Sequence, residues 1–138
     1  MRQVSEDLEE GVDLGLDFSK LDGVAGQGAL PCAVQDVTTG EVILVAYVNA
    51  EALVAAVGRR RAVFWSTSRS ELWEKGATSG AGFELVEVRV NCEQNSLLYL
   101  VRPLREGICH TRNRAGAARN CFYRRLDFAT GQFEMLDP

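Results

Sequence analysis

Three of the four cysteines lie in polar sequence surroundings and together have the donor atoms of a catalytic zinc site. They are Cys92 within Asn-Cys-Glu-Gln-Asn, Cys109 within Cys-His-Thr, and Cys121 within Asn-Cys-Phe. Three thiolates hold a zinc ion and leave its fourth coordination position for water. Zinc lowers the pKa of bound water to about 7, so such a site supplies hydroxide near neutral pH. The pattern therefore predicts a hydrolase or a deaminase.

The cysteine spacing does not fit a closed structural zinc finger, because the chain contains no Cys-x-x-Cys pair. Taken singly, each cysteine could instead be a small buried hydrophobic residue. Cys32, inside the apolar run Leu30–Val34, is assigned to that class. His110 is the only histidine and could be a fourth ligand, a proton shuttle or a surface residue. We favour proton transfer, since neighbouring side chains on an extended segment point to opposite sides.

The segment around Cys92 has a second set of candidate ligands. If residues 91–95 continue a strand, Asn91, Glu93 and Asn95 project on one face and Cys92 on the other. Oxygen ligands suit a hard cation such as magnesium, whereas thiolate suits zinc. A strand end that turns into a hairpin explains the same residues without any metal.

A polar stretch, Ser68–Gly82, is expected to be a long functional loop that binds substrate. The candidates in it are Arg69, Trp73, Lys75, Thr78 and Ser79. The indole of Trp73 can stack on a base, although a core position would suit it equally. Arg69 and Lys75 can hold phosphates, and the hydroxyls that follow them suit an anion nest.

Short strands around one helix must position these residues. The helix is expected from Ala50 to about Gly58, with Asn49 as its N-cap. Strands are expected at Pro31–Asp36, Glu41–Val48, Ala62–Thr67, Phe83–Val90, Ser96–Arg102, Cys121–Phe128 and Gln132–Leu136. The sum predicts an α+β fold, mostly antiparallel, as a small barrel-like domain.

Composition limits the class of protein. A chain of 138 residues suits one domain, with residues 1–15 as an N-terminal extension and 16–138 as the domain. The net charge of −4 argues against binding to nucleic acid or to an anionic membrane surface. No signal peptide or bilayer-length apolar run is visible, so we expect a cytoplasmic protein with reduced cysteines.

Several long motifs resemble the phosphoribosyl-AMP cyclohydrolase family of histidine biosynthesis. The main one runs from Trp65 through Trp-Glu-Lys-Gly-Ala-Thr-Ser to Gly80. Upstream it is accompanied by Ala46-Tyr-Val-Asn49, and downstream by Cys109-His-Thr111 and Cys121-Phe-Tyr-Arg124. The resemblance covers roughly residues 16–126.

The resemblance implies a homodimer with zinc at the subunit interface. Cys92 would come from one subunit, and Cys109 and Cys121 from the other. The family has three magnesium-binding aspartates where this chain has Asn91, Glu93 and Asn95. With one carboxylate left of three, we expect a divalent cation to bind more weakly there. The 112–120 loop before the last cysteine is also longer than is usual in the family.

The implied reaction is hydrolysis of the N1–C6 bond in the adenine ring of N1-(5-phosphoribosyl)-AMP, which gives the phosphoribosylformimino-AICAR nucleotide. Hydroxide generated at zinc would attack C6, with His110 assisting proton transfer. Arg69, Lys75 and Arg124 are the candidates for the two phosphates. Two alternatives stay open: a paralogue that uses the zinc site for metal handling, and a hydrolase of another modified purine nucleotide.

Overall fold

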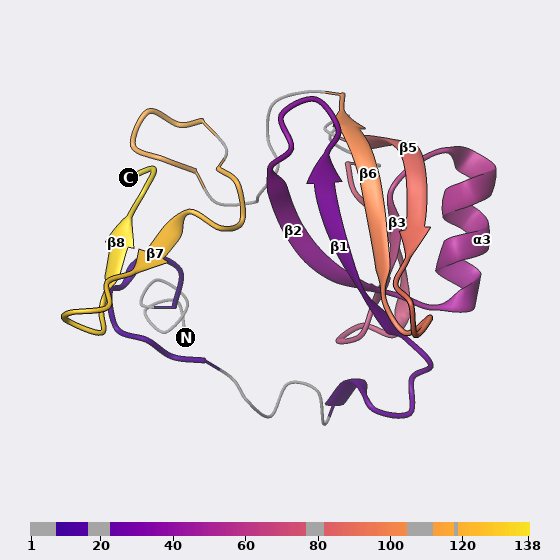
Figure 1. The fold of residues 1–138 in the computed structure, drawn as a ribbon, viewed down its shortest axis with the longest axis horizontal. Helices are drawn as coiled ribbons and strands as arrows, with labels where there is room; N and C mark the ends of the chain where they lie inside the picture. The colour runs from indigo at the N-terminus through magenta and orange to yellow at the C-terminus, as the bar shows by residue number, and fades with distance from the viewer. Residues whose placement is uncertain (1–7, 17–22, 77–81, 105–111, 118) are drawn as a thin grey trace.

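The computed structural model describes residues 8–16, 23–76, 82–104, 112–117 and 119–138 (Figure 1). The elements in chain order are β1 (Leu30–Asp36), β2 (Val42–Val48), α3 (Ala50–Arg59), β3 (Val63–Ser66), β4 (Glu71–Glu74), β5 (Phe83–Val90), β6 (Leu97–Pro103), β7 (Arg124–Leu126) and β8 (Phe133–Met135). The fold is α+β with one main helix, as predicted. Within the described ranges, no helix is both long enough and apolar enough to cross a bilayer.

The largest sheet has the strand order β2-β1-β6-β5. Its β1–β2 and β5–β6 pairs are antiparallel, whereas β1 and β6 pair in parallel, with Cys32 opposite Leu97 and Asp36 opposite Val101. The predicted antiparallel character therefore holds except at this central pair. The barrel-like closure is wrong for the described residues, because β3 pairs with β4 in a separate ribbon and leaves the large sheet open.

The β1–β2 connection is the tight hairpin that the sequence predicts. The Asp36 carboxylate accepts hydrogen bonds from the backbone N–H groups of Thr38 (2.8 Å) and Thr39 (3.3 Å). Gly40 completes the turn at φ +79°, a backbone conformation that glycine adopts without steric cost. This turn fixes the register in which β2 runs back along β1.

Helix α3 begins where the sequence predicts and ends one residue later than expected. The Asn49 side chain accepts a hydrogen bond from the Ala52 N–H (2.8 Å), as an N-cap does. Gly58 is not the stop: the helix continues to Arg59, and Arg60 takes the left-handed conformation that ends it. The chain then leaves to hydrogen-bond along the outer edge of β5.

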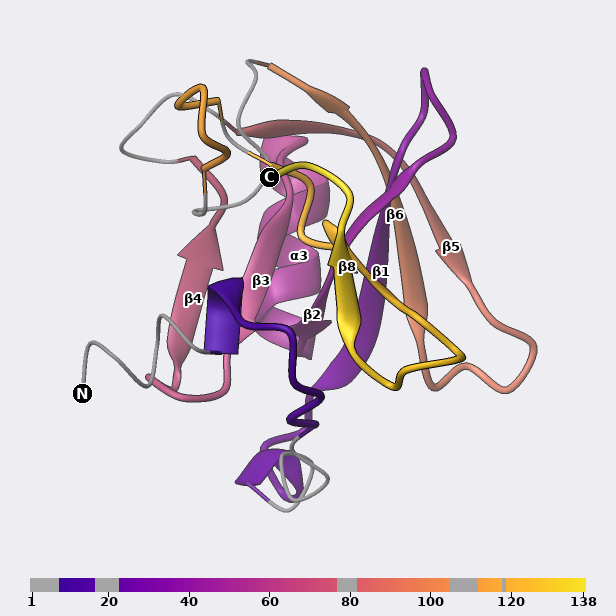
Figure 2. The same ribbon diagram turned by 90° about the vertical axis from the view of Figure 1, so that its left-hand side faces the viewer.

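One hydrophobic core lies between α3, the β3–β4 ribbon and the large sheet (Figure 2). Ala52 and Ala56, one helical turn apart, are fully buried and let the helix approach closely. The Tyr99 ring is fully buried and its hydroxyl donates to the Val63 carbonyl (3.2 Å), which ties β6 to β3. Cys32 is also fully buried, which confirms its assignment as a core residue.

Strand β4 lies inside the stretch that was expected to be a loop. Its four residues pair with β3, and Trp73 opposite Phe64 brings the two rings to a centroid distance of 5.2 Å. The turn between the strands places Ser70 at φ +52°, and its N–H donates to the Ser66 carbonyl (2.7 Å). A strand this short is stabilised by its partner and not by its own sequence, so the prediction missed it.

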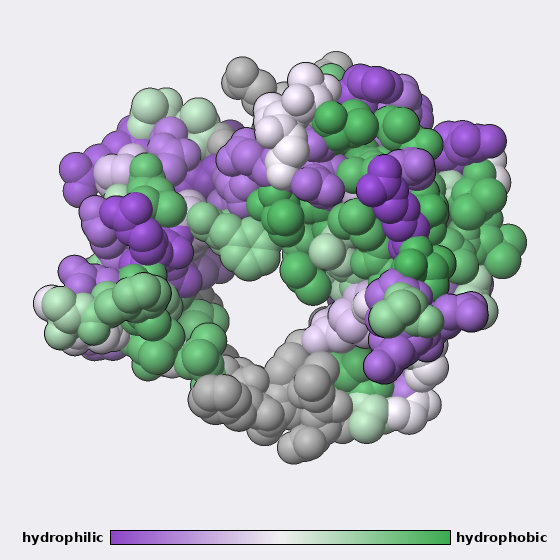
Figure 3. All heavy atoms as spheres, viewed as in Figure 1, coloured by the Kyte–Doolittle hydropathy of each residue, from purple (hydrophilic) through white to green (hydrophobic). Residues whose placement is uncertain are grey.

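The C-terminal unit, residues 119–138, stands apart from the large sheet (Figure 1). This unit consists of the β7–β8 hairpin and its flanking residues. Residues 8–13, here called the N-terminal arm, lie against it, and the Phe133 N–H donates to the Val12 carbonyl (2.7 Å). In the space-filling view an opening separates this part from the sheet, and hydrophobic surface borders some of its rim (Figure 3). Several large apolar side chains of β2 and the C-terminal unit are exposed: Val42, Val45, Phe122, Leu126, Phe128 and Leu136.

Candidate functional site

The β5–β6 turn carries Cys92 and the three oxygen-bearing residues around it. Strand β5 ends at Val90, so residues 91–95 do not continue it and the predicted alternation of faces does not apply. The three side chains still meet, because the turn folds them together: the Asn91 amide donates to Asn95 Oδ1 (2.6 Å). The Asn95 amide in turn donates to the Glu93 carboxylate (3.3 Å). Cys92 is exposed beside this network.

Asn91 has a structural role in that turn. Its Oδ1 accepts the backbone N–H groups of Asn95 and Ser96, both at 2.9 Å. Gln94 takes a left-handed conformation, φ +55°, which closes the loop. The amide oxygen of Asn91 is therefore already engaged by two donors, and the only carboxylate of the set is that of Glu93.

Cys121 lies at the far side of the large sheet, on the outer edge of β2. Its N–H donates to the Ile43 carbonyl (3.2 Å), and the preceding Asn120 amide donates to the Val42 carbonyl (3.2 Å). These two bonds anchor the start of the C-terminal unit to β2. The Cys121 side chain is exposed.

Cys92 and Cys121 do not come together within one chain. Cys92 follows the end of β5 and lies beside β6, whereas Cys121 lies beyond β2. Strand β1 lies between β6 and β2. Counted from β6 through β1 and β2 to the Cys121 segment, at least three strand spacings separate them across the sheet, or about 14 Å. Two sulfurs on one zinc lie only about 4 Å apart, since each Zn–S bond is about 2.3 Å. Cys109 and His110 lie outside the described residues, and no cluster of three or more His, Cys, Asp or Glu side chains suitable for a metal occurs within them.

A second feature is an open cleft of about 560 Å³ between β2 and the β3–β4 ribbon. Its lining residues are Val45, Ala46, Tyr47, Trp65, Ser66, Thr67, Ser68, Arg69 and Trp73. Two predicted substrate-binding residues, Arg69 and Trp73, are thus on its walls. The Arg69 Nε donates to the Ser66 hydroxyl (3.2 Å) and forms an ion pair with Glu71 (3.5 Å), so the guanidinium is held at the exposed rim.

The other predicted substrate-binding residues are placed differently. Lys75 follows the end of β4 and does not line this cleft. Its backbone N–H donates to the Ala62 carbonyl (3.3 Å). Thr78 and Ser79 lie outside the described residues. Arg124 belongs to β7, where its guanidinium lies over the Phe133 ring (4.8 Å) and donates to the Gly11 carbonyl (3.3 Å).

Two residues at the cleft were missed by the sequence reasoning. Tyr47 lines it from β2, and the Ala46–Asn49 motif in which it lies was noted only for its resemblance to the family. Gln27 braces the cleft from outside: its Oε1 accepts from the Trp65 indole (3.1 Å), and its amide donates to the Thr67 carbonyl (3.1 Å). Gln27 is far from both partners in sequence, so no local pattern could have identified it.

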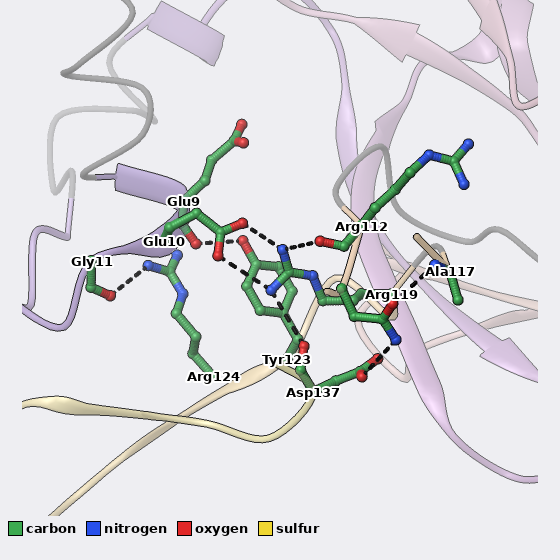
Figure 4. Close-up of polar contacts among 10 residues, drawn as sticks. Glu9, Glu10, Gly11, Arg112, Ala117, Arg119, Tyr123, Arg124 and Asp137 are labelled. Atoms are coloured by element: carbon green, nitrogen blue, oxygen red, sulfur yellow. Dashed lines mark hydrogen bonds and ion pairs between the residues drawn. The ribbon is translucent and has the colours of Figure 1, made fainter. Parts of the chain in front are cut away.

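A buried arginine is a further feature without a sequence signal. Arg119 is 2% exposed and forms an ion pair with Glu10 of the N-terminal arm (Figure 4). Its guanidinium also lies over the Tyr123 ring, 4.1 Å from the centroid.

The fourth cysteine, Cys32, lies in the core and is not a candidate ligand. Burial raises the pKa of its thiol to about 12, which keeps this cysteine protonated.

Comparisons with known proteins agree on one family. The sequence profile described as phosphoribosyl-AMP cyclohydrolase matches residues 44–123. A protein of that name from Sphingopyxis alaskensis is 45% identical over 110 residues, which cover 80% of this chain and 82% of the relative. One from Rhodopseudomonas palustris is 36% identical over 133 residues, covering 96% and 83%. The histidine biosynthesis bifunctional protein HisIE of Aquifex aeolicus is 38% identical over 101 residues, covering 73% of this chain and 47% of that longer protein.

Proposed function

The chain belongs to the phosphoribosyl-AMP cyclohydrolase family, and we propose that it catalyses the hydrolysis for which the family is named, as a step of histidine biosynthesis. The substrate is N1-(5-phosphoribosyl)-AMP, and the bond broken joins N1 and C6 of its adenine ring. The observation that carries the proposal is the match over residues 44–123, which spans both the cleft and Cys92, Cys109 and Cys121.

The three cysteines are the proposed zinc ligands. Their sulfur donors suit zinc, and both described members, Cys92 and Cys121, have exposed side chains that an ion can reach. When bound, zinc supplies a Lewis acid that activates water for hydrolysis. The separation of Cys92 from Cys121 across the sheet favours a site that uses Cys92 of one subunit with Cys109 and Cys121 of another. The exposed apolar side chains of β2 and the C-terminal unit favour such a dimer.

Magnesium does not fit the residues of the β5–β6 turn. Magnesium requires several oxygen ligands in near-octahedral order, and carboxylates bind it best. Here Asn91 uses its oxygen to cap the turn, and Asn95 Oδ1 accepts from the Asn91 amide. Glu93 alone remains as a charged oxygen ligand. The proposed reaction therefore has no step that depends on magnesium at this turn.

The cleft offers the groups that a purine nucleotide needs. The indole of Trp73 is oriented by Phe64 beneath it and can stack on the base. At the rim, Arg69 presents a guanidinium that can exchange its exposed Glu71 partner for a phosphate. Lys75 and Arg124, which do not line the cleft, are proposed for the second phosphate, and His110 is proposed for proton transfer to the leaving N1.

The asparagines in the β5–β6 turn favour one other candidate function. A paralogue that keeps the cysteines without the magnesium ligands could handle zinc without opening a ring, or act on another modified purine nucleotide. Turnover distinguishes these functions. Purified protein loaded with zinc should consume phosphoribosyl-AMP with and without added magnesium. Absence of ring opening under both conditions would reject the proposed reaction.

Mixing two inactive variants tests the shared zinc site. Cys92→Ala and Cys121→Ala should each lose bound zinc and activity. After subunit exchange, mixed dimers contain one site with all its ligands, so about a quarter of the wild-type activity should return. If mixing restores nothing although mass measurements show mixed dimers, the ligands are not shared between subunits.

A further inference from the structure

The N-terminal arm is fastened to the C-terminal unit at both main-chain and side-chain level. The Tyr123 hydroxyl donates to the Glu9 carbonyl (2.6 Å), and Arg124 donates to the Gly11 carbonyl (3.3 Å) (Figure 4). Further along, Asp13 forms a β-bridge with Gln132. Segments more than a hundred residues apart in sequence thus form one structure, and Glu10 lies in the middle of the arm.

Glu10 is the carboxylate that balances the buried charge of Arg119. Of the charged residues that the structure describes, Arg119 is the one that is buried. Both terminal nitrogens of its guanidinium donate to Glu10, and they also donate to the carbonyls of Arg112 (2.6 Å) and Asp137 (3.4 Å). A guanidinium out of water is tolerated only when it is paired and hydrogen-bonded. Without Glu10, Arg119 would keep two carbonyl partners and no counter-charge.

Arg119 in turn holds the chain on both sides of Cys121. Its bond to the Arg112 carbonyl closes the preceding loop, and its guanidinium packs on the Tyr123 ring that follows. Between these contacts, the Cys121 N–H is bound to the Ile43 carbonyl of β2. If Arg119 turned outward to reach water, the contacts on either side of Cys121 would be lost together.

We propose that Glu10 is a positioning residue: through Arg119 it holds the segment 119–123 in place and so orients the thiol of Cys121. The part of this inference that concerns zinc rests on the proposed function of Cys121 as a ligand. The part that concerns the order of the segment does not. The N-terminal arm is thereby a component of the site and not a dispensable extension.

Amide hydrogen exchange tests the local order directly. In Glu10→Gln, which keeps the shape and removes the charge, peptides covering residues 119–124 should exchange about tenfold faster, the change that accompanies a loss of about 1.4 kcal/mol in local stability. Peptides from β5 should exchange as in the wild type. The matched control is Glu134→Gln, which removes a carboxylate from the exposed ion pair with Arg125 in the same unit and should leave residues 119–124 unchanged.

Zinc affinity, measured by competition with a chromophoric chelator, separates positioning from mere folding. We expect the zinc affinity to fall about tenfold in Glu10→Gln, which corresponds to the same loss of about 1.4 kcal/mol. The affinity should recover in part in Glu10→Asp, because aspartate restores the charge. It should stay unchanged in Glu134→Gln. If Glu10→Gln does not fold, Glu10→Asp alone should show a smaller acceleration of exchange at 119–124.

Three results would overturn the inference. They are wild-type exchange at 119–124 in the Glu10 variants, acceleration that extends equally to β5, and accelerated exchange with undiminished zinc affinity. A wild-type protein that binds no zinc would instead reject the metal site of the proposed function. The exchange comparison would then still decide whether Glu10 orders the segment around Cys121.

Discussion

Replacing Gly82 with alanine should strain the junction between β4 and β5. A Cβ atom at this position would lie 2.8 Å from the Lys75 carbonyl oxygen, whereas ordinary contacts begin at 3.4 Å, so the backbone must move by about 0.6 Å. The contact is with main chain, which cannot rotate away as a flexible side chain can. Gly82 is therefore required by close packing and not by its φ angle.

Hydrogen bonds on both sides prevent easy relief of that strain. The Leu104 N–H donates to the Gly82 carbonyl (2.9 Å), and the Lys75 N–H donates to the Ala62 carbonyl (3.3 Å). Ala62 in turn donates to the Phe83 carbonyl (3.1 Å), so the two strands that would have to separate are tied together. Overpacking of this kind costs about 2 kcal/mol. For a chain of this length that loss corresponds to a fall of about 7 °C in Tm.

The matched control is Gly58→Ala, because Gly58 lies inside α3 and a methyl group added there would enter open space beside the helix's own backbone. There the same chemical change should raise the free energy of unfolding by about 0.5–1 kcal/mol, since alanine is the better helix former. Chemical and thermal denaturation of both variants measure the difference. Equal effects of the two substitutions, or a Gly82→Ala protein as stable as the wild type, would refute the packing argument.

Three further changes test the core, the helix and the buried thiol. Tyr99→Phe should lower the free energy of unfolding in urea by about 1 kcal/mol, because it leaves the Val63 carbonyl without its donor. Asn49→Ala should cost about 1 kcal/mol in the same assay by removing the N-cap of α3, and Asn49→Ser should recover most of it. Because burial raises the Cys32 pKa from 9.0 to about 12, only the unfolded chain loses this proton as the pH rises above 9. Stability should then fall between pH 9 and 12 by at most about 1.4 kcal/mol per pH unit from this group, and Cys32→Ala should flatten the decline.

The parts of the fold that the sequence predicts well are those with local causes. The hairpin turns after Asp36 and after Asp127 have the same pattern, Asp-x-x-Thr-Gly, and in both the carboxylate accepts two N–H groups of the turn. The N-cap of α3 is equally local. Each of these features depends on side chains within five residues of one another, so the local sequence is sufficient to predict it.

The parts that it predicts poorly depend on distant partners. Strand β4 is stable through β3, and the parallel pairing of β1 with β6 joins segments with no complementary local pattern. For the candidate site, the side chains of Arg69 and Trp73 could be chosen by type, and the cleft brings both together. The ion pair between Arg119 and Glu10 could not be predicted from the sequence, because a buried arginine and its carboxylate partner look the same in sequence as solvent-exposed ones.

The order of strands in the large sheet has a consequence for synthesis on the ribosome. Strand β6 (Leu97–Pro103) lies between β1 and β5, although both leave the exit tunnel before it. At about 5–20 residues per second, the nascent chain carries an unpaired edge of β1 for some seconds before its neighbour emerges. Such an edge is a template for pairing with other polypeptides. Slow translation before Leu97 should therefore favour aggregation, and a chaperone that shields the β1–β2 hairpin during that interval should raise the yield of native protein.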